Sequence, residues 1–107
     1  MSYILVLMTT ATRKEAEKIA RSLLTQKLIA CANTVGPVSS LFWWKGKISR
    51  ENEFLVLMKT SESLFEKLAT TIKQMHSYEV PEIIAVPITR GEQSYLKWLS
   101  ASLRKGE

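Results

Sequence analysis

Two side chains in this sequence could bind a metal ion or act in catalysis, and each residue type occurs only once. His76 follows an amphipathic stretch and stands close to Tyr78 and Glu79. Cys31 lies in a short segment that is predicted to be extended. An imidazole is a common metal ligand and general base, and a thiolate is a soft ligand and a nucleophile. A histidine at a helix end and a small buried cysteine are also ordinary structural residues, so packing remains the alternative for both.

A metal site built from one chain alone would be short of ligands. A closed structural zinc site needs four, and one cysteine and one histidine supply only two. Thioether sulfurs suit Cu(I), and Met8, Met58 and Met75 could add them, although all three also fit apolar core positions. A second subunit could supply further ligands. The residues therefore leave open both a shared metal site and simple core packing.

The sequence lacks the short motifs that are typical of hydrolases and nucleotide-binding enzymes. It has no His-Glu-x-x-His pair, no nucleophile elbow and no phosphate-binding glycine loop. The carboxylate pairs Glu51/Glu53 and Glu79/Glu82 fall in predicted strands or loops, where a solvated carboxylate is the ordinary finding. We therefore predict a protein without enzymatic activity.

Apolar periodicity predicts the elements that must position these residues. Continuous apolar runs predict strands at 3–8 and 82–88, with two longer strands between them at 29–44 and 48–58. Apolar residues at helical spacing predict three helices, which begin near Thr12, near Thr60-Ser61 and near Tyr95. The resulting order, β-α-β-β-α-β with a C-terminal helix, is that of the ferredoxin-like α+β fold with an antiparallel sheet. We predict one such domain over residues 1–107, with the first and third strands in the centre of the sheet.

The two long strands are predicted to form one hairpin that is too long for its own domain. Gly46, within Lys45-Gly46-Lys47, can adopt the positive φ of a tight turn, and Gly36-Pro37 predicts a bulge in the first arm. Each arm has about 15 residues and spans roughly 50 Å. A compact domain of this length is only about 35 Å across. The apolar tip, Leu41-Phe42-Trp43-Trp44, therefore needs another chain to cover it.

The strand sequences give a second reason to expect an oligomer. Two helices can cover only one face of the sheet, and a strand with one solvated face should alternate apolar and polar residues. The runs at 4–8, 54–58 and 83–86 are instead continuously apolar. An exposed face of this kind would exceed the apolar patch that a soluble monomer tolerates. We therefore predict a closed homo-oligomer whose sheets pack against one another.

Charge and composition argue against nucleic acid and membrane partners. The net charge is +5, but the basic residues alternate with glutamates on predicted helix faces, as on a solvated surface. The adjacent Trp43 and Trp44 point to opposite faces of their strand and cannot form one stacking platform. No apolar run approaches a membrane span, and the first run lacks the basic flank of a secretory signal. With a single cysteine, these features predict a cytoplasmic protein.

Several segments together resemble one known family. They are Ala-Cys-Ala-Asn at 30–33, Ser-Leu-Phe-Trp-Trp-Lys-Gly-Lys-Ile at 40–48, Glu53, Lys59-Thr60, His-Ser-Tyr-Glu-Val-Pro-Glu-Ile-Ile at 76–84 and Tyr-Leu-Lys-Trp-Leu at 95–99. Their order and spacing are similar to those of the CutA family of divalent-cation-tolerance proteins. The resemblance implies a ferredoxin-like fold, a stable homotrimer built like the PII signalling proteins, and a link to tolerance of copper and other divalent cations. It implies no catalytic activity.

The resemblance also implies candidate site residues. The copper ligands of some bacterial members align with Met8, Met75 and His76, of which only His76 keeps the family's residue type. The proline that usually follows is Ser77 here. Thioethers favour Cu(I) over harder cations. The resemblance further implies that these residues line the cleft between subunits: Cys31, Trp44, Glu53, Lys59, His76, Tyr78 and Tyr95.

The resulting expectation is a trimeric divalent-cation-tolerance protein that binds copper or another divalent cation weakly near His76, at the subunit interface. Cys31 is a further candidate ligand. One alternative is a PII-like sensor whose cleft binds a small anionic ligand through Lys59. Another is a scaffold that binds no ligand.

Overall fold

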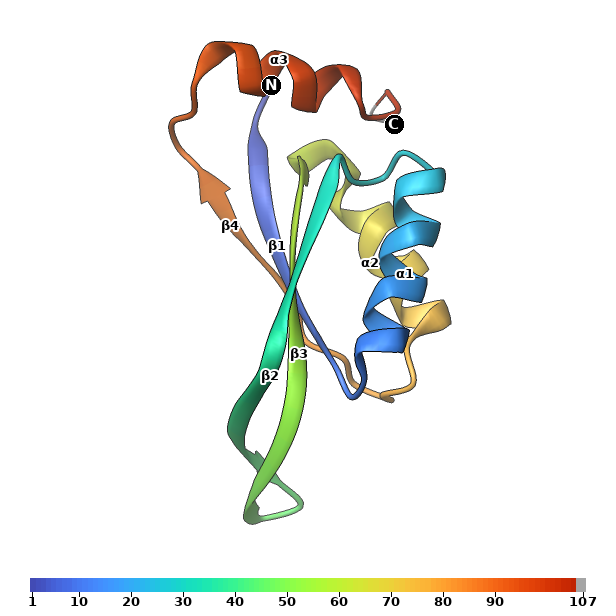
Figure 1. Ribbon diagram of the computed structural model, residues 1–107, viewed down its shortest axis with the longest axis vertical. Helices are drawn as coiled ribbons and strands as arrows, with labels where there is room; N and C mark the ends of the chain where they lie inside the picture. The colour runs from blue at the N-terminus through green and yellow to red at the C-terminus, as the bar shows by residue number, and fades with distance from the viewer. Residues whose placement is uncertain (106–107) are drawn as a thin grey trace.

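The chain folds into a four-stranded antiparallel sheet with three helices (Figure 1). The computed structural model describes residues 1–105, and the last two residues of the predicted domain lie outside the described residues. The strands are β1 (Tyr3–Thr10), β2 (Cys31–Trp44), β3 (Lys47–Ser61) and β4 (Ile83–Ile88), in the spatial order β2-β3-β1-β4. The helices are α1 (Arg13–Thr25), α2 (Phe65–Met75) and α3 (Gln93–Ala101), and a short 3-10 turn covers Glu62–Leu64. The predicted ferredoxin-like arrangement, with β1 and β3 central, is confirmed.

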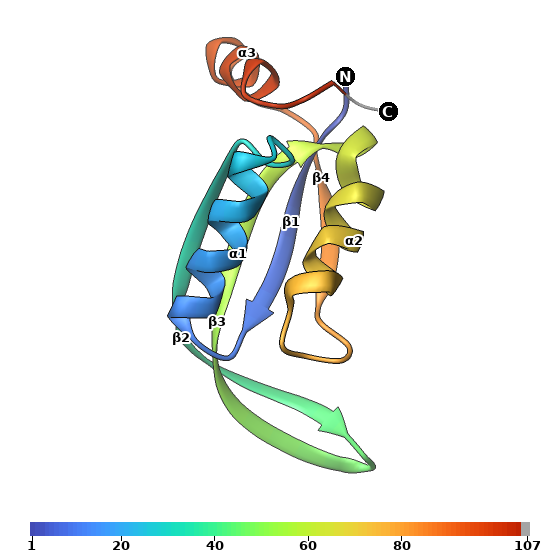
Figure 2. The same ribbon diagram turned by 90° about the vertical axis from the view of Figure 1, so that its right-hand side faces the viewer.

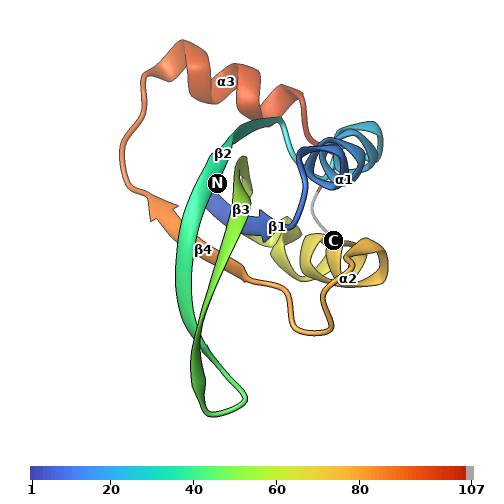
Figure 3. The same cartoon turned by 60° about the horizontal axis from the view of Figure 1, so that its bottom comes forward.

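Helices α1 and α2 lie side by side on one face of the sheet, and α3 lies across one end of the strands (Figures 2 and 3). Alternate residues of the central strands point toward α1 and α2. Among them Val6, Met8, Val56 and Met58 are completely buried. The apolar stripes of the helices complete this core with Ala16, Ile19, Leu23, Leu68 and Ile72. The main core thus lies between the sheet and this helix pair, and Leu99 of α3 is also completely buried.

The opposite face of the sheet, called here the open face, is also apolar. Leu5 and Leu7 of β1 and Leu55 and Leu57 of β3 lie on it and are half-buried. At its edges Val35, Ile84 and Val86 are 47%, 53% and 44% exposed. Within one chain this face stays uncovered, since α3 reaches only its end (Figure 3). The open face is the uncovered apolar surface that the strand sequences predict.

The long hairpin projects beyond the rest of the molecule (Figure 1). Its strands have 14 and 15 residues, as predicted, and the molecule measures 44 × 26 × 22 Å. Trp44 pairs with Lys47, so the turn consists of Lys45 and Gly46 alone, both with positive φ (51° and 76°). The register shifts between Val35 and Val38, which confirms the bulge expected at Gly36-Pro37.

The start of α2 differs from the sequence prediction. Thr60 and Ser61 do not cap this helix, because both belong to β3 and pair with Ile4 and Tyr3. The Thr60 hydroxyl instead donates to the carbonyl of Leu28 at 2.7 Å. Threonine is a capping residue that is also frequent in strands, and here pairing with β1 extends the strand past the predicted boundary. The helix begins at Phe65, after the 3-10 turn.

Candidate functional site

His76 follows α2 directly and its side chain is buried, 9% exposed. Its Nε2 lies 2.8 Å from the carbonyl oxygen of Thr9, and its Nδ1 accepts a hydrogen bond from the Tyr78 backbone N–H at 3.0 Å. An acceptor at Nε2 and a donor at Nδ1 fix the neutral tautomer with its proton on Nε2. The ring therefore joins the end of α2 to the end of β1, and neither nitrogen has a lone pair free for a ligand.

The loop after His76 is held by α1. The Glu15 carboxylate accepts from the backbone N–H of Ser77 at 2.7 Å and from its hydroxyl at 3.0 Å. Thr12 caps α1 as predicted, because its hydroxyl accepts from the backbone N–H of Glu15 at 3.1 Å. The Glu15 side chain, however, reaches across to the loop instead of back to Thr12. Ser77 supplies the N–H that this contact needs, which a proline at this position would lack.

Glu53 and Tyr78 form the most buried polar pair of the predicted cleft residues. Glu53 on β3 is only 6% exposed, and its Oε2 accepts from the Tyr78 hydroxyl at 2.7 Å. Burial and the Glu53 carboxylate both raise the pKa of Tyr78 well above its usual range. The phenol therefore stays a hydrogen-bond donor throughout the physiological pH range, and it stabilises the Glu53 carboxylate.

These two residues lie in a groove of about 800 Å³ beneath the long hairpin. Trp44 and its apolar neighbours form one side of the groove, and the loop before β4 forms the other. Four carboxylates line it and no basic side chain does: Glu51, Glu53, Glu79 and Glu82. Burial raises the pKa of Glu82, and the Glu53 carboxylate adds to the rise. Three predicted cleft residues, Trp44, Glu53 and Tyr78, thus meet in one place.

The remaining predicted cleft residues form a second cluster near α3. Lys59 pairs with Cys31 across the β2–β3 ladder, and its ammonium lies 5.8 Å from the centre of the Tyr95 ring. The Tyr95 hydroxyl is 3.7 Å from the Cys31 sulfur. Lys59 also donates to the side-chain oxygen of Asn33 at 3.4 Å. Lys59, Cys31 and Tyr95 therefore come together, but apart from the groove.

The residues proposed as metal ligands are not assembled within one chain. Met8 lies completely buried on the helix side of the sheet, where it pairs with Val56 and Ile83. Met75 is half-buried and packs against the same core. Cys31 pairs with Lys59, which in turn pairs with Leu5 of β1. Leu5 is four residues along β1 from Thr9, whose carbonyl binds His76. Across residues 1–105, no three His, Cys, Asp or Glu side chains are arranged to hold a metal ion.

The side chains of one chain therefore do not fit a resident metal ion, and the assignments of Met8, Met75, His76 and Cys31 remain predictions. Sequence reasoning also missed two contributors to these clusters. Asn33 lies two residues after Cys31, on the same side of β2, so strand periodicity could have indicated it. Glu15 could not have been found, since its contact with Ser77 depends on how α1 and α2 pack.

A four-stranded antiparallel sheet in the order β2-β3-β1-β4, with two helices on one face, places this protein in the ferredoxin-like class of α+β proteins. The family model described as CutA1 divalent ion tolerance protein matches residues 4–102. The chain therefore belongs to the CutA1 family, as its resemblance implies.

Individual relatives agree with this assignment. Protein CutA 1, chloroplastic, of Oryza sativa subsp. japonica is 40% identical over 102 residues, which are 95% of this chain and 58% of the relative. The divalent-cation tolerance protein CutA of Archaeoglobus fulgidus is 41% identical over 98 residues, 92% of this chain and 95% of the relative. The chain thus spans over half the length of the plant relative and nearly all of the archaeal one.

Solved structures give the same result for the fold. The crystal structure of CutA1 from Oryza sativa has a TM-score of 0.95 at 39% identity, covering 98% of this chain and 96% of that chain. The periplasmic divalent cation tolerance protein CutA from Archaeoglobus fulgidus has a TM-score of 0.92 at 39% identity, covering 95% of this chain and 99% of that chain. Within the described residues, no helix is long and apolar enough to cross a membrane.

Proposed function

We propose that this protein acts as a homotrimer in tolerance to divalent cations, and that it binds copper or another divalent cation weakly at the subunit interface. Membership of the CutA1 family supports the cation-tolerance role. The observation that carries the assembly is the uncovered apolar open face, whose edge residues Val35, Ile84 and Val86 are about half exposed. Two or more copies that pack these faces together remove them from water. The number three rests on the family resemblance, because the face alone requires only one further copy.

Weak binding is expected from the geometry around His76. A cation at Nδ1 must displace the hydrogen bond from the Tyr78 N–H, and a cation at Nε2 must displace the Thr9 carbonyl. Either exchange costs free energy that a preformed site would not lose. The Glu15 carboxylate, 3.7 Å from Nδ1, is a hard ligand close to the ring in this chain, and further ligands would have to come from a neighbouring copy. We propose a cytoplasmic protein without catalytic activity, although one relative is named as chloroplastic and one as periplasmic.

Two measurements test this function separately. Sedimentation equilibrium should give three times the 12.2 kDa mass of the chain, and a mass of 12.2 kDa would refute the assembly. Titration of the metal-free protein with Cu(II) and with Cu(I) tests the cation site. We expect weak binding that His76→Ala reduces, whereas Lys73→Ala, an exposed change on α2, leaves it unchanged. Equal affinity of His76→Ala and the wild type would exclude His76 as a ligand.

A further inference from the structure

Lys59 is a cation on the apolar open face of the sheet. Its neighbours in the two adjacent strands are Leu5 of β1 and Cys31 of β2. Leu57, two residues earlier in β3, points to the same side. An ammonium group among such neighbours loses part of its hydration and needs polar partners to replace it. Its surroundings therefore indicate what this position can bind.

No carboxylate serves as a partner for Lys59 within residues 1–105. The close contact found there between a carboxylate and a basic side chain is that of Glu15 with the Nδ1 of His76, at 3.7 Å. Burial acts to lower the pKa of Lys59, whereas the Cys31 thiol and the Tyr95 hydroxyl act to raise it, and the net pKa lies above its ordinary value of 10.5. The group is therefore a permanent cation at neutral pH. Within the described residues it donates to the side-chain oxygen of Asn33 at 3.4 Å and also interacts with the Tyr95 and Cys31 side chains.

The side chains around this cation include hydrogen-bond donors from two other elements, β2 and α3. Asn33 of β2 accepts through Oδ1 and keeps its amide N–H groups for another molecule. The Tyr95 hydroxyl of α3 lies 3.7 Å from the Cys31 sulfur, a weak hydrogen bond, and it also interacts with the Lys59 ammonium. A cation with neutral donors on either side is complementary to the two oxygens of one carboxylate.

An aromatic surface lies next to these donors. The rings of Tyr95 and Trp98 are 5.4 Å apart between centroids and tilted by 42°. They are 40% and 46% exposed. With Leu5 and Val86 of the open face, they offer an apolar surface beside the charged group. A ligand that carries both a carboxylate and an apolar group would match both parts.

We propose that Lys59, Asn33 and Tyr95 bind the carboxylate of a small organic acid whose apolar part lies against the Tyr95 and Trp98 rings. A phosphate ester fits less well, because a dianion is usually matched by more than one cation or by an arginine fork. All of these residues belong to one chain, and because Lys59 lies on the open face, the inference requires that the proposed trimer leave the α3 end of that face accessible. It goes beyond cation tolerance, because it assigns this family member an anionic ligand.

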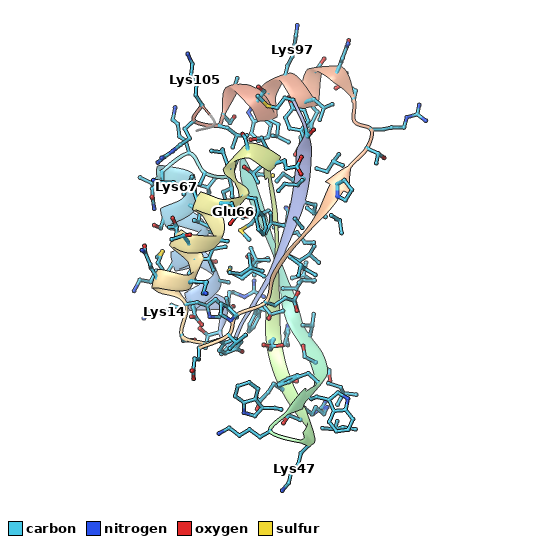
Figure 4. All side chains as sticks on the ribbon, turned by 180° about the vertical axis from the view of Figure 1, so that it is seen from behind. Lys14, Lys47, Glu66, Lys67, Lys97 and Lys105 are labelled. Atoms are coloured by element: carbon cyan, nitrogen blue, oxygen red, sulfur yellow. The ribbon has the colours of Figure 1, made fainter. Side chains whose placement is uncertain are left out.

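Isothermal titration with sodium benzoate, the simplest aromatic carboxylate, tests the site. We expect binding to the wild type and about a tenfold weaker affinity for Lys59→Met, as for the loss of one charged hydrogen bond. Lys59→Arg should restore most of the affinity. The matched control is Lys47→Met, which removes a lysine from the tip of the hairpin, at the other end of the molecule from α3 (Figure 4). Sedimentation of each variant separates a loss of binding from a loss of assembly.

The rate of Cys31 alkylation is a second measurement of benzoate binding in the same samples. Cys31 lies 3.7 Å from the Tyr95 hydroxyl, so bound benzoate should slow its alkylation by iodoacetamide in the wild type but not in Lys59→Met. Tyr95→Phe, which removes only a hydroxyl, should weaken benzoate binding with the fold intact. The proposal is overturned if benzoate neither binds nor protects Cys31, or if Lys59→Met binds it as tightly as the wild type. It is also overturned if inorganic phosphate binds more tightly than benzoate.

Discussion

The two faces of the sheet are built by alternate residues of the same strands, yet they differ in what covers them. On the helix side Val6, Val56 and Met58 are completely buried by α1 and α2. On the open face their neighbours Leu5, Leu55 and Leu57 are equally apolar but only half-buried. Burial inside one chain therefore explains only half of the apolar residues in β1 and β3. The proposed partner that covers the open face would account for the other half, so substitutions on the two faces should have different consequences.

The largest effect is expected on the helix side, for Val56→Asp. Its side chain has no exposed surface, so the new carboxylate would be buried without a partner. We expect a loss of about 4 kcal/mol or more in the free energy of unfolding, enough to unfold a marginally stable domain. Circular dichroism and urea titration measure this loss. A folded Val56→Asp protein with wild-type stability would contradict the assignment of the core to this face.

Leu57→Asp makes the same chemical change one residue further along β3, on the open face. Its side chain is half-buried in the single chain, and the carboxylate can reach water there. We expect the far-ultraviolet circular dichroism spectrum of the wild type together with a sedimentation mass of 12.2 kDa. The comparison fails if Leu57→Asp unfolds as Val56→Asp does. Retention of the full assembly would mean that the open face is not the interface.

Tyr78→Phe tests the polar end of the open face, near the hairpin. The change removes the hydroxyl that donates to Glu53 at 2.7 Å and leaves a buried carboxylate without that partner. The cost should be about 1–3 kcal/mol in the free energy of unfolding. Tyr3→Phe is the matched control, because the Tyr3 hydroxyl makes no hydrogen bond within residues 1–105. Equal urea midpoints for the two variants would show that the Glu53–Tyr78 pair adds nothing to stability.

Most of this architecture could be predicted from the sequence because it depends on local patterns. The stripes of α1 and α2, the turn at Gly46 and the bulge after Val35 are each specified within a few residues. The uncovered face also follows from local pattern, since continuously apolar strands exceed what two helices can bury. The start of α2 was mispredicted because the pairing of Ser61 with Tyr3 is a contact across the sheet.

The candidate site was less predictable, because its geometry depends on distant contacts. The sequence singles out His76 as a rare side chain, but not that Thr9 and Tyr78 occupy both its nitrogens. It likewise gives no means of knowing that the predicted cleft residues divide into two clusters. One cluster lies at Glu53 and Tyr78 and the other at Lys59 and Tyr95. The partners of His76 and the separation into two clusters both follow from strand register and helix packing, which a single sequence does not encode locally.

The smallest effect is expected from Glu82→Gln, through pH. The pKa of Glu82 is raised from its ordinary value of 4.5 by burial and by Glu53. Between 4.5 and the raised pKa the folded state holds more protons than the unfolded state, so stability is lost as pH rises through that window. A glutamine stays neutral, so the variant should gain stability relative to the wild type as pH rises, with no gain below pH 4.5. Urea midpoints from pH 4 to pH 8 measure this difference.

Glu66→Gln, at an exposed position on α2 (Figure 4), is the control. Its urea midpoint should change with pH in the same way as that of the wild type. A difference between Glu82→Gln and the wild type that stays constant with pH would mean that folding does not raise the pKa of Glu82.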